Sequence, residues 1–232
     1  MSNLVTLAGL SNSGKSTSLK YLNPEETFII SCTNKQLQIP GFRKKYHKVE
    51  VKEGKLVGNW YVNNNYAQID KILDLVSARR DDIKVVIIDD ANYLLSNETF
   101  LNATTKGYEK FSIMAKNYYD LIQHCQNLRD DLTVVFVTHI ENYGTDIDPE
   151  YRMWTTGKML TSQINLDGLF SYIIYSERYI DDVDGEVHYR FKTRTDGNDT
   201  CRSVDGCFED KYIEPNMKLV LDTINKFENG EE

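Results

Sequence analysis

The sequence predicts an α/β fold in which a mainly parallel sheet is flanked by helices and extended by a C-terminal antiparallel hairpin. Three observations predict it. Apolar strand-like runs alternate with amphipathic helical segments through the first two thirds of the chain. A glycine-rich loop directly follows the first of these runs. Near the C-terminus, two strand-like segments flank the turn residues Asp184 and Gly185, as in a hairpin.

The strands are expected where short runs are apolar almost throughout, which is typical of strands buried on both faces. These runs lie at residues 4–9, 27–32, 84–90 and 132–139. A helix is expected to open at residues 15–22, behind the glycine-rich loop. Apolar residues at helical spacing indicate two more helices, the second being the longest. They are Ile69, Ile72, Leu73 and Val76 for one, and Phe111, Met114, Tyr118, Leu121, Ile122, Cys125 and Leu128 for the other.

Length and composition indicate one domain. The chain has 232 residues, of which 41% are hydrophobic, enough for one sizeable core. We therefore expect a single domain at residues 1–226, followed by a flexible acidic tail at residues 227–232.

Charge and cysteine content exclude several classes of protein. A net charge of -8 argues against a protein that coats nucleic acid or membrane with its whole surface, although a local basic patch can still bind. The 4 cysteines form no CxxC pair and have no histidine at metal-ligand spacing, so we expect free thiols and no zinc site. The sequence has neither a signal-peptide pattern nor a long apolar run, which predicts a cytoplasmic protein without membrane partners.

The stretch GLSNSGKST at residues 9–17 matches the phosphate-binding loop pattern GxxxxGK[ST]. Its glycines let successive backbone N–H groups point at phosphate oxygens, and the following helix N-terminus adds to this anion cradle. Lys15 would reach the β- and γ-phosphates of ATP, and the Ser16 hydroxyl would bind Mg²⁺. The residues assigned to the cradle are Gly9, Asn12, Ser13, Gly14, Lys15, Ser16 and Thr17. The alternative is an ordinary glycine-rich connector.

A phosphate loop predicts an acidic residue at the carboxyl end of a nearby strand, because Mg²⁺ needs a carboxylate there. KVVIIDD at residues 84–90 supplies two. Asp89 is expected to hold the Mg²⁺ shell, usually through water. Asp90 is a candidate to orient or deprotonate the attacking water. The alternative is a solvated strand end.

The fourth strand ends in VTHIEN, which offers a polar sensor. Some nucleotide hydrolases insert a strand between the loop strand and the acidic strand and place a polar side chain at its tip. Thr138 and His139 occupy that position here. We expect His139 to hydrogen-bond the γ-phosphate or the attacking water. Glu141 is a rival to Asp90 as catalytic base, and a purely structural histidine is the alternative.

The hairpin carries alternating cations. Arg190, Lys192 and Arg194 would share one face of a strand, with Tyr189, Phe191 and Thr193 on the other. Such a row, or Arg202, could neutralise γ-phosphate charge across a subunit boundary or contact a DNA backbone. An ordinary solvated strand face is the alternative.

Two other segments mix aromatic and basic residues in a way that suits single-stranded nucleic acid. FRKKYHK lies at residues 42–48, and YRMWTTGK lies at residues 151–158. In the second segment Tyr151 or Trp154 could stack on bases, with phosphate contacts from Arg152 and Lys158. Core packing is the alternative for Trp154.

Nearly the whole chain resembles the phage-encoded RecA-like P-loop ATPases, a single-core group often encoded beside recombination and replication genes. The resemblance is carried by the following stretches: GLSNSGKST, TNKQLQIPGFRKKY, VVIIDDANYLL, VTHIE, GKMLTSQINLDGLFSYIIYSE, RFKTRTDGNDTCRSVDGCFE and YIEPNMKLVLDTI. The first and third stretches are shared by many ATPases, whereas GKMLTSQINLDGLFSYIIYSE and RFKTRTDGNDTCRSVDGCFE are more specific.

The resemblance implies a RecA-like core with a five-stranded parallel centre, ATP and Mg²⁺ dependence, and a homo-oligomeric ring or filament with nucleotide between subunits. It also implies action on single-stranded DNA in recombination, beside a single-strand-binding protein, in the host cytoplasm. The chain departs from the family where relatives carry a lysine in place of Cys201 and Arg202. It also lacks the glutamate that RecA has after the second strand, which shifts the base role to Asp90 or Glu141.

Two other functions stay open at this stage. A small-molecule or nucleotide kinase would also combine a phosphate loop with scattered arginines, although no lid-like insertion stands out. A nucleotide-gated binding or loader protein would use bound ATP only to set a conformation.

Overall fold

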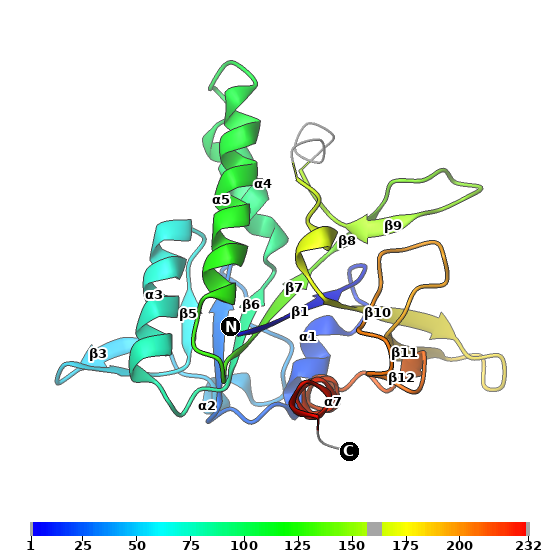
Figure 1. The fold of residues 1–232 in the computed structure, drawn as a ribbon, viewed down its shortest axis with the longest axis horizontal. Coiled ribbons are helices and arrows are strands. Elements are labelled where there is room, and N and C mark those ends of the chain that lie inside the picture. Colours follow the sequence, from blue (N-terminus) through cyan, green and yellow to red (C-terminus); the bar gives the residue numbers. More distant parts are fainter. Residues whose placement is uncertain (1, 157–163, 231–232) are drawn as a thin grey trace.

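The computed structural model describes residues 2–156 and 164–230, and it has the expected α/β architecture. One eight-stranded sheet has the order β12-β11-β10-β1-β7-β6-β2-β5 (Figure 1). Neighbouring strands are parallel from β10 to β5, whereas β11 is antiparallel to both β10 and β12. The bounds are β1 Asn3–Ala8, β2 Thr27–Ser31, β5 Trp60–Val62, β6 Val85–Asp89, β7 Thr133–Thr138, β10 Tyr172–Ile180, β11 Val187–Lys192 and β12 Tyr212–Ile213.

The sheet order bears on two expectations. Strand β7 lies between β1, which precedes the glycine-rich loop, and β6, which ends in Asp89, so the predicted inserted strand is confirmed. The antiparallel C-terminal hairpin is also confirmed, because β10 pairs with β11 at the sheet edge. The parallel part is one strand wider than a five-stranded centre, since β5 pairs in parallel with β2.

Helices cover both faces of the sheet, which explains why the strands are apolar almost throughout. On one face, side chains such as Phe136 pack under α3 (Tyr66–Arg79), α4 (Asn92–Leu101) and α5 (Glu109–Gln126). On the other face, side chains such as Val135 pack under the short helices α1 (Lys15–Ser18), η1 (Leu19–Tyr21) and α2 (Phe42–Lys45), together with α7 (Met217–Asn229). Each strand therefore alternates between two separate cores.

The predicted helical stripes are buried as expected, with small differences at the ends. Ile69, Ile72, Leu73 and Val76 of α3 are all buried, and so are six of the seven residues of the second stripe: Met114, Tyr118, Leu121, Ile122 and Cys125 inside α5, and Leu128 just after it. The helix behind the loop is shorter than predicted, because α1 ends at Ser18 and tightens into the 3₁₀ turn η1. The tail prediction is wrong for residues 227–229, because α7 continues to Asn229 and ends on the left-handed Gly230.

Two small hairpins project from the sheet. β3 (Glu50–Lys52) pairs with β4 (Lys55–Val57), and β8 (Ile140–Asn142) pairs with β9 (Tyr151–Met153) directly after β7. All four cysteines are free and buried, in agreement with the sequence-based expectation. Within residues 2–156 and 164–230, none of the helices has the length and apolar character needed to cross a membrane.

η2 (Asp167–Leu169) is a single 3₁₀ turn before β10. The preceding stretch GKMLTSQ, including Lys158, lies outside the described residues.

Candidate functional site

The loop after β1 contains two residues with left-handed backbone. Asn12 and Gly14 have φ angles of 61° and 94°, a conformation found in turns that bind anions. Gly9 lies so close to β10 that a Cβ there would sit 2.5 Å from the Ser176 carbonyl oxygen. The Ser176 hydroxyl donates a 2.7 Å hydrogen bond to the Ser13 carbonyl. This fold therefore requires both glycines of the motif: Gly9 because β10 leaves no room for a side chain, and Gly14 because of its positive φ.

Lys15 is turned back into its own loop. Its Nζ donates hydrogen bonds of 2.8 Å to the carbonyl oxygens of Gly9 and Leu10. Burial lowers the pKa of Lys15 to about 8, although the nearby Asp90 and Asp89 oppose this change. The ammonium thus lies at the centre of the loop, held by oxygens that a phosphate could replace.

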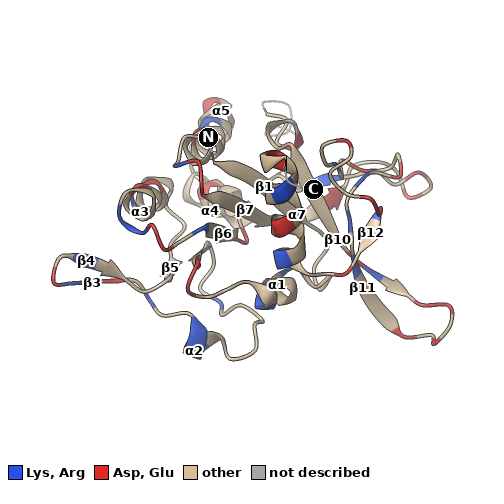
Figure 2. Ribbon diagram, turned by 60° about the horizontal axis from the view of Figure 1, so that its bottom comes forward, with Lys and Arg blue, Asp and Glu red and all other residues tan. Residues whose placement is uncertain are grey.

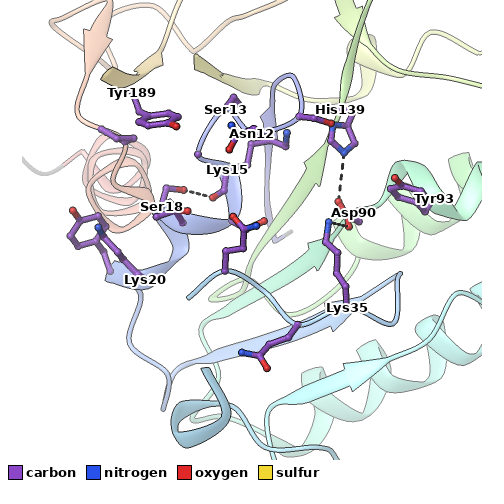
Figure 3. A pocket seen from close by; sticks show the side chains of 18 residues that line it. Asn12, Ser13, Lys15, Ser18, Lys20, Lys35, Asp90, Tyr93, His139 and Tyr189 are labelled. Atoms are coloured by element: carbon purple, nitrogen blue, oxygen red, sulfur yellow. Dashed lines mark hydrogen bonds and ion pairs between the residues drawn. The ribbon is translucent and has the colours of Figure 1, made fainter. Parts of the chain in front are cut away.

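A cavity of about 480 Å³ opens in front of this loop (Figure 3). Residues 11–18 form one wall, and Asp90 and His139 from the ends of β6 and β7 form another. Most of the residues assigned to phosphate and catalysis therefore meet at one place, as the carboxyl ends of parallel strands do. The remaining lining residues come from other segments: Lys20, Tyr21, Lys35, Gln36, Gln38, Tyr93, Tyr189 and Pro215.

Asp89 is a buried carboxyl group without a protein partner. It is 0% exposed, and neither side-chain oxygen has a hydrogen-bond partner among the described residues. Burial, reinforced by the charge of Asp90, raises the pKa of Asp89 to about 7. An unpaired buried carboxylate is costly, so this position favours a cation next to it.

The residues around Asp89 fit Mg²⁺ if a phosphate completes the site. In the part of the chain that the structure describes, no group of three or more His, Cys, Asp and Glu side chains could hold a metal by itself. Mg²⁺ typically takes one or two protein oxygens and fills its shell with water and substrate phosphate. Asp89 and the cavity-lining Ser16 are oxygen donors of that kind.

Asp90 is held in a strained conformation at the cavity wall. Its φ angle of 56° is rare for a residue with a side chain. Its carboxylate pairs with Lys35 Nζ at 2.6 Å and accepts a hydrogen bond of 3.1 Å from the Thr33 hydroxyl. His139 Nε2 lies 3.8 Å from its other oxygen. This arrangement fixes the carboxylate where it faces the loop.

His139 connects Asp90 with the phosphate loop. Burial is the largest of the effects that lower its pKa, with the nearby Lys15 second, so the imidazole is neutral near pH 7. A hydrogen bond with the Gly9 backbone acts in the opposite direction. The backbone N–H of His139 donates to Asn92 Oδ1 at 3.3 Å, which fixes the strand end.

Several cavity residues were not predicted from the sequence, among them Lys35 and Tyr189. Lys35 follows β2, whose end pairs with Asp89 of β6, so it belongs to the same sheet edge as the acidic pair. Tyr189 comes from β11, and its ring lies 3.2 Å from where a Cβ on Gly14 would be. Lys35 could have been predicted only from the strand order, which places the end of β2 beside the end of β6 and which the sequence alone does not reveal. Tyr189 was predicted to face away from the row of cations, but its contact with the loop was not.

Two predicted catalytic residues do not line the cavity. Glu141 lies on β8, where it pairs with Arg152 at 3.1 Å and accepts a hydrogen bond of 3.4 Å from Thr155. Arg202 is exposed, and its backbone pairs with Ile173, which lies level with Thr6 in the sheet rather than at the loop. Neither residue contributes to this cavity within one subunit, and Asp90 is the candidate base that the geometry favours.

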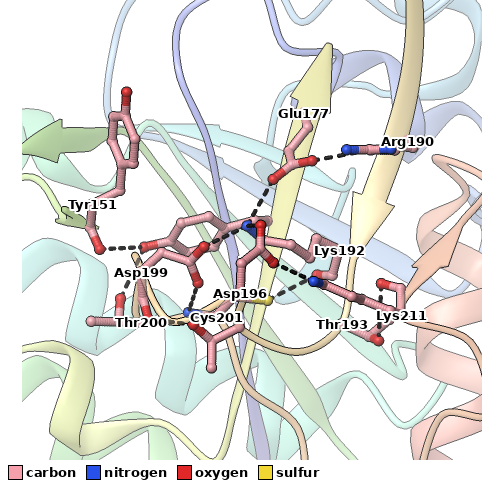
Figure 4. Close-up of polar contacts among 12 residues, drawn as sticks. Tyr151, Glu177, Arg190, Lys192, Thr193, Asp196, Asp199, Thr200, Cys201 and Lys211 are labelled. Atoms are coloured by element: carbon pink, nitrogen blue, oxygen red, sulfur yellow. Dashed lines mark hydrogen bonds and ion pairs between the residues drawn. The ribbon is translucent and has the colours of Figure 1, made fainter. Parts of the chain in front are cut away.

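Two cations of the hairpin, Arg190 and Lys192, are paired with protein carboxylates (Figure 4). Lys192 is only 3% exposed and pairs with Glu177 at 2.9 Å, with Asp196 at 3.4 Å and with Asp199. Burial alone would lower its pKa, but the hydrogen bonds to Asp199 and Glu177 raise it. The alternation of side chains along the strand was predicted correctly. The loop after β11 buries Lys192, however, so within one subunit this lysine is neither on a solvated face nor free to contact γ-phosphate or DNA.

Arg190 and Arg194 also have partners on the same chain. Arg190 pairs with Glu177 at 3.1 Å, and its guanidinium lies 3.5 Å from the ring centre of Tyr212. Arg194 donates a hydrogen bond of 2.8 Å to the Glu209 carbonyl. Within one subunit, the row of cations therefore stabilises the hairpin.

The two aromatic and basic segments are only partly available to a ligand. Phe42 and Tyr46 are buried in the core with their rings stacked at 5.1 Å, so they cannot stack on bases. Arg43, Lys44 and Lys45 of α2 stay exposed and form a basic surface (Figure 2). In the second segment, Arg152 pairs with Glu141 and stacks 4.6 Å from the ring centre of Tyr143, and Trp154 is half-buried.

No protein-family model matches the chain, and no curated protein matches it either. The sequence motifs and the cavity geometry are therefore what indicates a function.

Proposed function

We propose that this protein is a RecA-like P-loop ATPase that binds Mg·ATP in the cavity and hydrolyses it. The observation that carries the proposal is the meeting of Lys15 and Asp90 in one cavity at the carboxyl ends of β1 and β6, with the buried, unpaired Asp89 next to Asp90 and close enough to influence the pKa of Lys15. These groups come from segments far apart in the sequence. A connector loop and a solvated strand end would not need to meet.

The roles follow from the positions of the side chains. The loop amides of residues 9–17 would bind the phosphate chain, and Lys15 would exchange its carbonyl partners for phosphate oxygens. Mg²⁺, when bound, would neutralise charge on the β- and γ-phosphates. Ser16 would ligate it, and Asp89 would hold its water shell. Asp90 would orient a water and accept its proton, with His139 beside it as a sensor of the terminal phosphate.

Adenine as the base, single-stranded DNA as the polymer, and a ring or filament with nucleotide between subunits form the wider part of the proposal. They are supported by the sequence resemblance to phage RecA-like ATPases. The same resemblance supports two further parts of the proposal. Arg202 would act on the nucleotide of a neighbouring subunit, and a single-strand-binding protein would be a partner. The exposed cations of α2 are the described surface best suited to a DNA backbone.

Calorimetry of the whole chain with ATP and Mg²⁺ tests the proposal. We expect saturable binding, which Lys15→Ala should abolish, whereas Lys71→Ala on the exposed surface of α3 should bind normally. Circular dichroism should show both variants folded. Absence of ATP binding by the wild-type protein would overturn the proposal.

Turnover assays separate the proposed ATPase from its alternatives. We expect slow phosphate release that single-stranded DNA changes in rate. Transfer of phosphate to a nucleoside or nucleoside monophosphate faster than to water would identify a kinase instead. ATP binding that changes the particle size in light scattering, without phosphate release, would identify a nucleotide-gated module.

A further inference from the structure

Lys35 occupies the cavity wall opposite the phosphate loop. Its ammonium pairs with Asp90 at 2.6 Å, while its side chain is 57% exposed toward the cavity and solvent. Figure 3 shows it reaching up to Asp90 from the segment after β2, with Lys15 across the cavity. The carboxylate partner is nearly buried and conformationally strained, whereas lysine carries its charge on a long, flexible stem.

Three lysines line this cavity, and two of them, Lys15 and Lys35, are close enough to repel each other. After burial and the opposing carboxylates, the charge of Lys35 is a further influence on the pKa of Lys15 and lowers it. Each ammonium is balanced by protein oxygens: Lys15 by the carbonyls of Gly9 and Leu10, and Lys35 by Asp90. A polyphosphate between them would satisfy both cations at once.

We propose that Lys35 binds the terminal phosphate of a nucleoside triphosphate and so makes the site select triphosphate over diphosphate. This inference rests on the proposed function of the same cavity. Lys15 lies inside the loop, where it serves the phosphates that the loop encloses. Lys35 lies beside Asp90 and His139, at the side of the cavity where the terminal phosphate would face the candidate base.

The exchange also prepares Asp90 for catalysis. When the Lys35 ammonium moves from the carboxylate to the phosphate, Asp90 Oδ2 keeps the Thr33 hydrogen bond but loses the adjacent cation, which makes the carboxylate a better acceptor for a proton of water. The water oxygen then bonds to the γ-phosphorus while the bond from that phosphorus to the bridging oxygen of ADP breaks. The proton of the water passes to Asp90 and from there to the released phosphate.

Binding of a non-hydrolysable ATP analogue and of ADP, each with Mg²⁺, tests the proposal by calorimetry. We expect Lys35→Ala to weaken the ATP analogue about tenfold or more, the effect of one charge-assisted hydrogen bond, and to leave ADP unchanged. Lys35→Arg should retain most of the preference for triphosphate. Lys15→Ala should weaken both ligands, and Lys71→Ala neither.

A purely structural ion pair with Asp90 predicts a different result. Lys35→Ala would then weaken both ligands in equal proportion or weaken neither, and either outcome overturns the proposal. Lys35→Gln, which can still donate a hydrogen bond to Asp90, guards against misfolding of the alanine variant and should also lose the preference. If the wild-type protein binds neither ligand, the proposed function itself fails, and the inference about Lys35 fails with it.

Discussion

The Ser176 hydroxyl on β10 donates a 2.7 Å hydrogen bond to the carbonyl of Ser13 in the glycine-rich loop after β1. The next residue, Glu177, pairs with both Arg190 and Lys192 of β11. The loop that would hold phosphate is therefore joined through one strand to the ion pairs of the C-terminal hairpin. A conformational change in the loop could therefore reach the ion pairs of the hairpin through β10.

Gly9→Ala should disrupt the loop without unfolding the protein. A Cβ at residue 9 would meet the Ser176 carbonyl at 2.5 Å, and that atom is backbone in the middle of a strand, so the loop has to move instead. We expect ATP affinity to fall at least tenfold in calorimetry while circular dichroism stays unchanged. Gly107→Ala is the control, because open space surrounds that glycine, although its φ of 96° makes some loss of stability expected there. Normal ATP binding by Gly9→Ala would show that the loop does not need this close approach.

Asp89→Asn should stabilise the nucleotide-free protein and change its pH dependence. The pKa of Asp89 is raised to about 7, above its unfolded value, so the folded state binds the extra proton between about pH 4 and 7. The stability of the wild-type protein should therefore fall as pH rises through this window, by an amount on the order of a few kcal/mol. Asparagine carries no charge, so the variant should lack this loss.

Urea denaturation at a series of pH values, without nucleotide, measures the effect. The exposed Asp146→Asn serves as the control and should follow the wild-type curve. Parallel curves for wild type and Asp89→Asn would contradict the assignment of a buried, unpaired carboxylate. The same Asp89→Asn variant should also lose Mg²⁺-dependent ATP binding.

The sheet could be predicted from the sequence because its strands are buried on both faces. Runs such as VVII before Asp89 are apolar throughout, and this pattern leaves few other structures open. The position of the tight loop could also be predicted, because glycine is common where a turn needs a positive φ, and Gly14 has one. These signals are local, and local signals survive in a single sequence.

The missing parts of the site depend on contacts between distant segments. Lys35 meets Asp90 only because β2 and β6 are neighbours in the sheet. Lys192 looked like a surface cation because alternation does not reveal that Asp196 and Asp199 fold back over it. Arg202 and Glu141 were chosen by their position in motifs, but the strands carry them away from the cavity.

His124→Gln should destabilise the protein more at low pH than at high pH. Its ring bridges two carboxylates of α3, with Nδ1 at 2.8 Å from Asp70 and Nε2 at 2.8 Å from Asp74. Burial opposes the charge, but the hydrogen bonds to these two carboxylates raise the pKa of His124 overall. The stabilisation is fully present below the unfolded pKa of about 6.5 and is lost as pH rises through the higher folded pKa.

Thermal denaturation at pH 5.5 and at pH 9 would measure this difference. These two values are chosen to lie on either side of the titration, about one unit below 6.5 and well above it. We expect a clear loss of melting temperature at the lower pH and a smaller loss at the higher one. An equal loss at both values would mean that the α3–α5 contact does not depend on the charge of the ring. This window starts near pH 6.5, well above the start of the Asp89 window near pH 4, so the two variants differ in the pH at which stability begins to change.

Lys192→Met should destabilise the hairpin strongly and leave DNA binding unaffected. The side chain is 3% exposed, and its removal would leave Asp199, itself nearly buried, and Glu177 without their main cation. Breaking a buried ion pair from one side costs about 3–5 kcal/mol, because the remaining charge stays desolvated. Lys211→Met is the matched control, since Lys211 pairs with Asp196 of the same cluster but is far more exposed, and this variant should lose much less stability.

Urea denaturation gives the stabilities, and fluorescence anisotropy with single-stranded DNA gives the affinities under conditions where both variants are folded. A large loss of DNA affinity without a loss of stability in Lys192→Met would instead mean that the lysine leaves its carboxylates to contact the polymer.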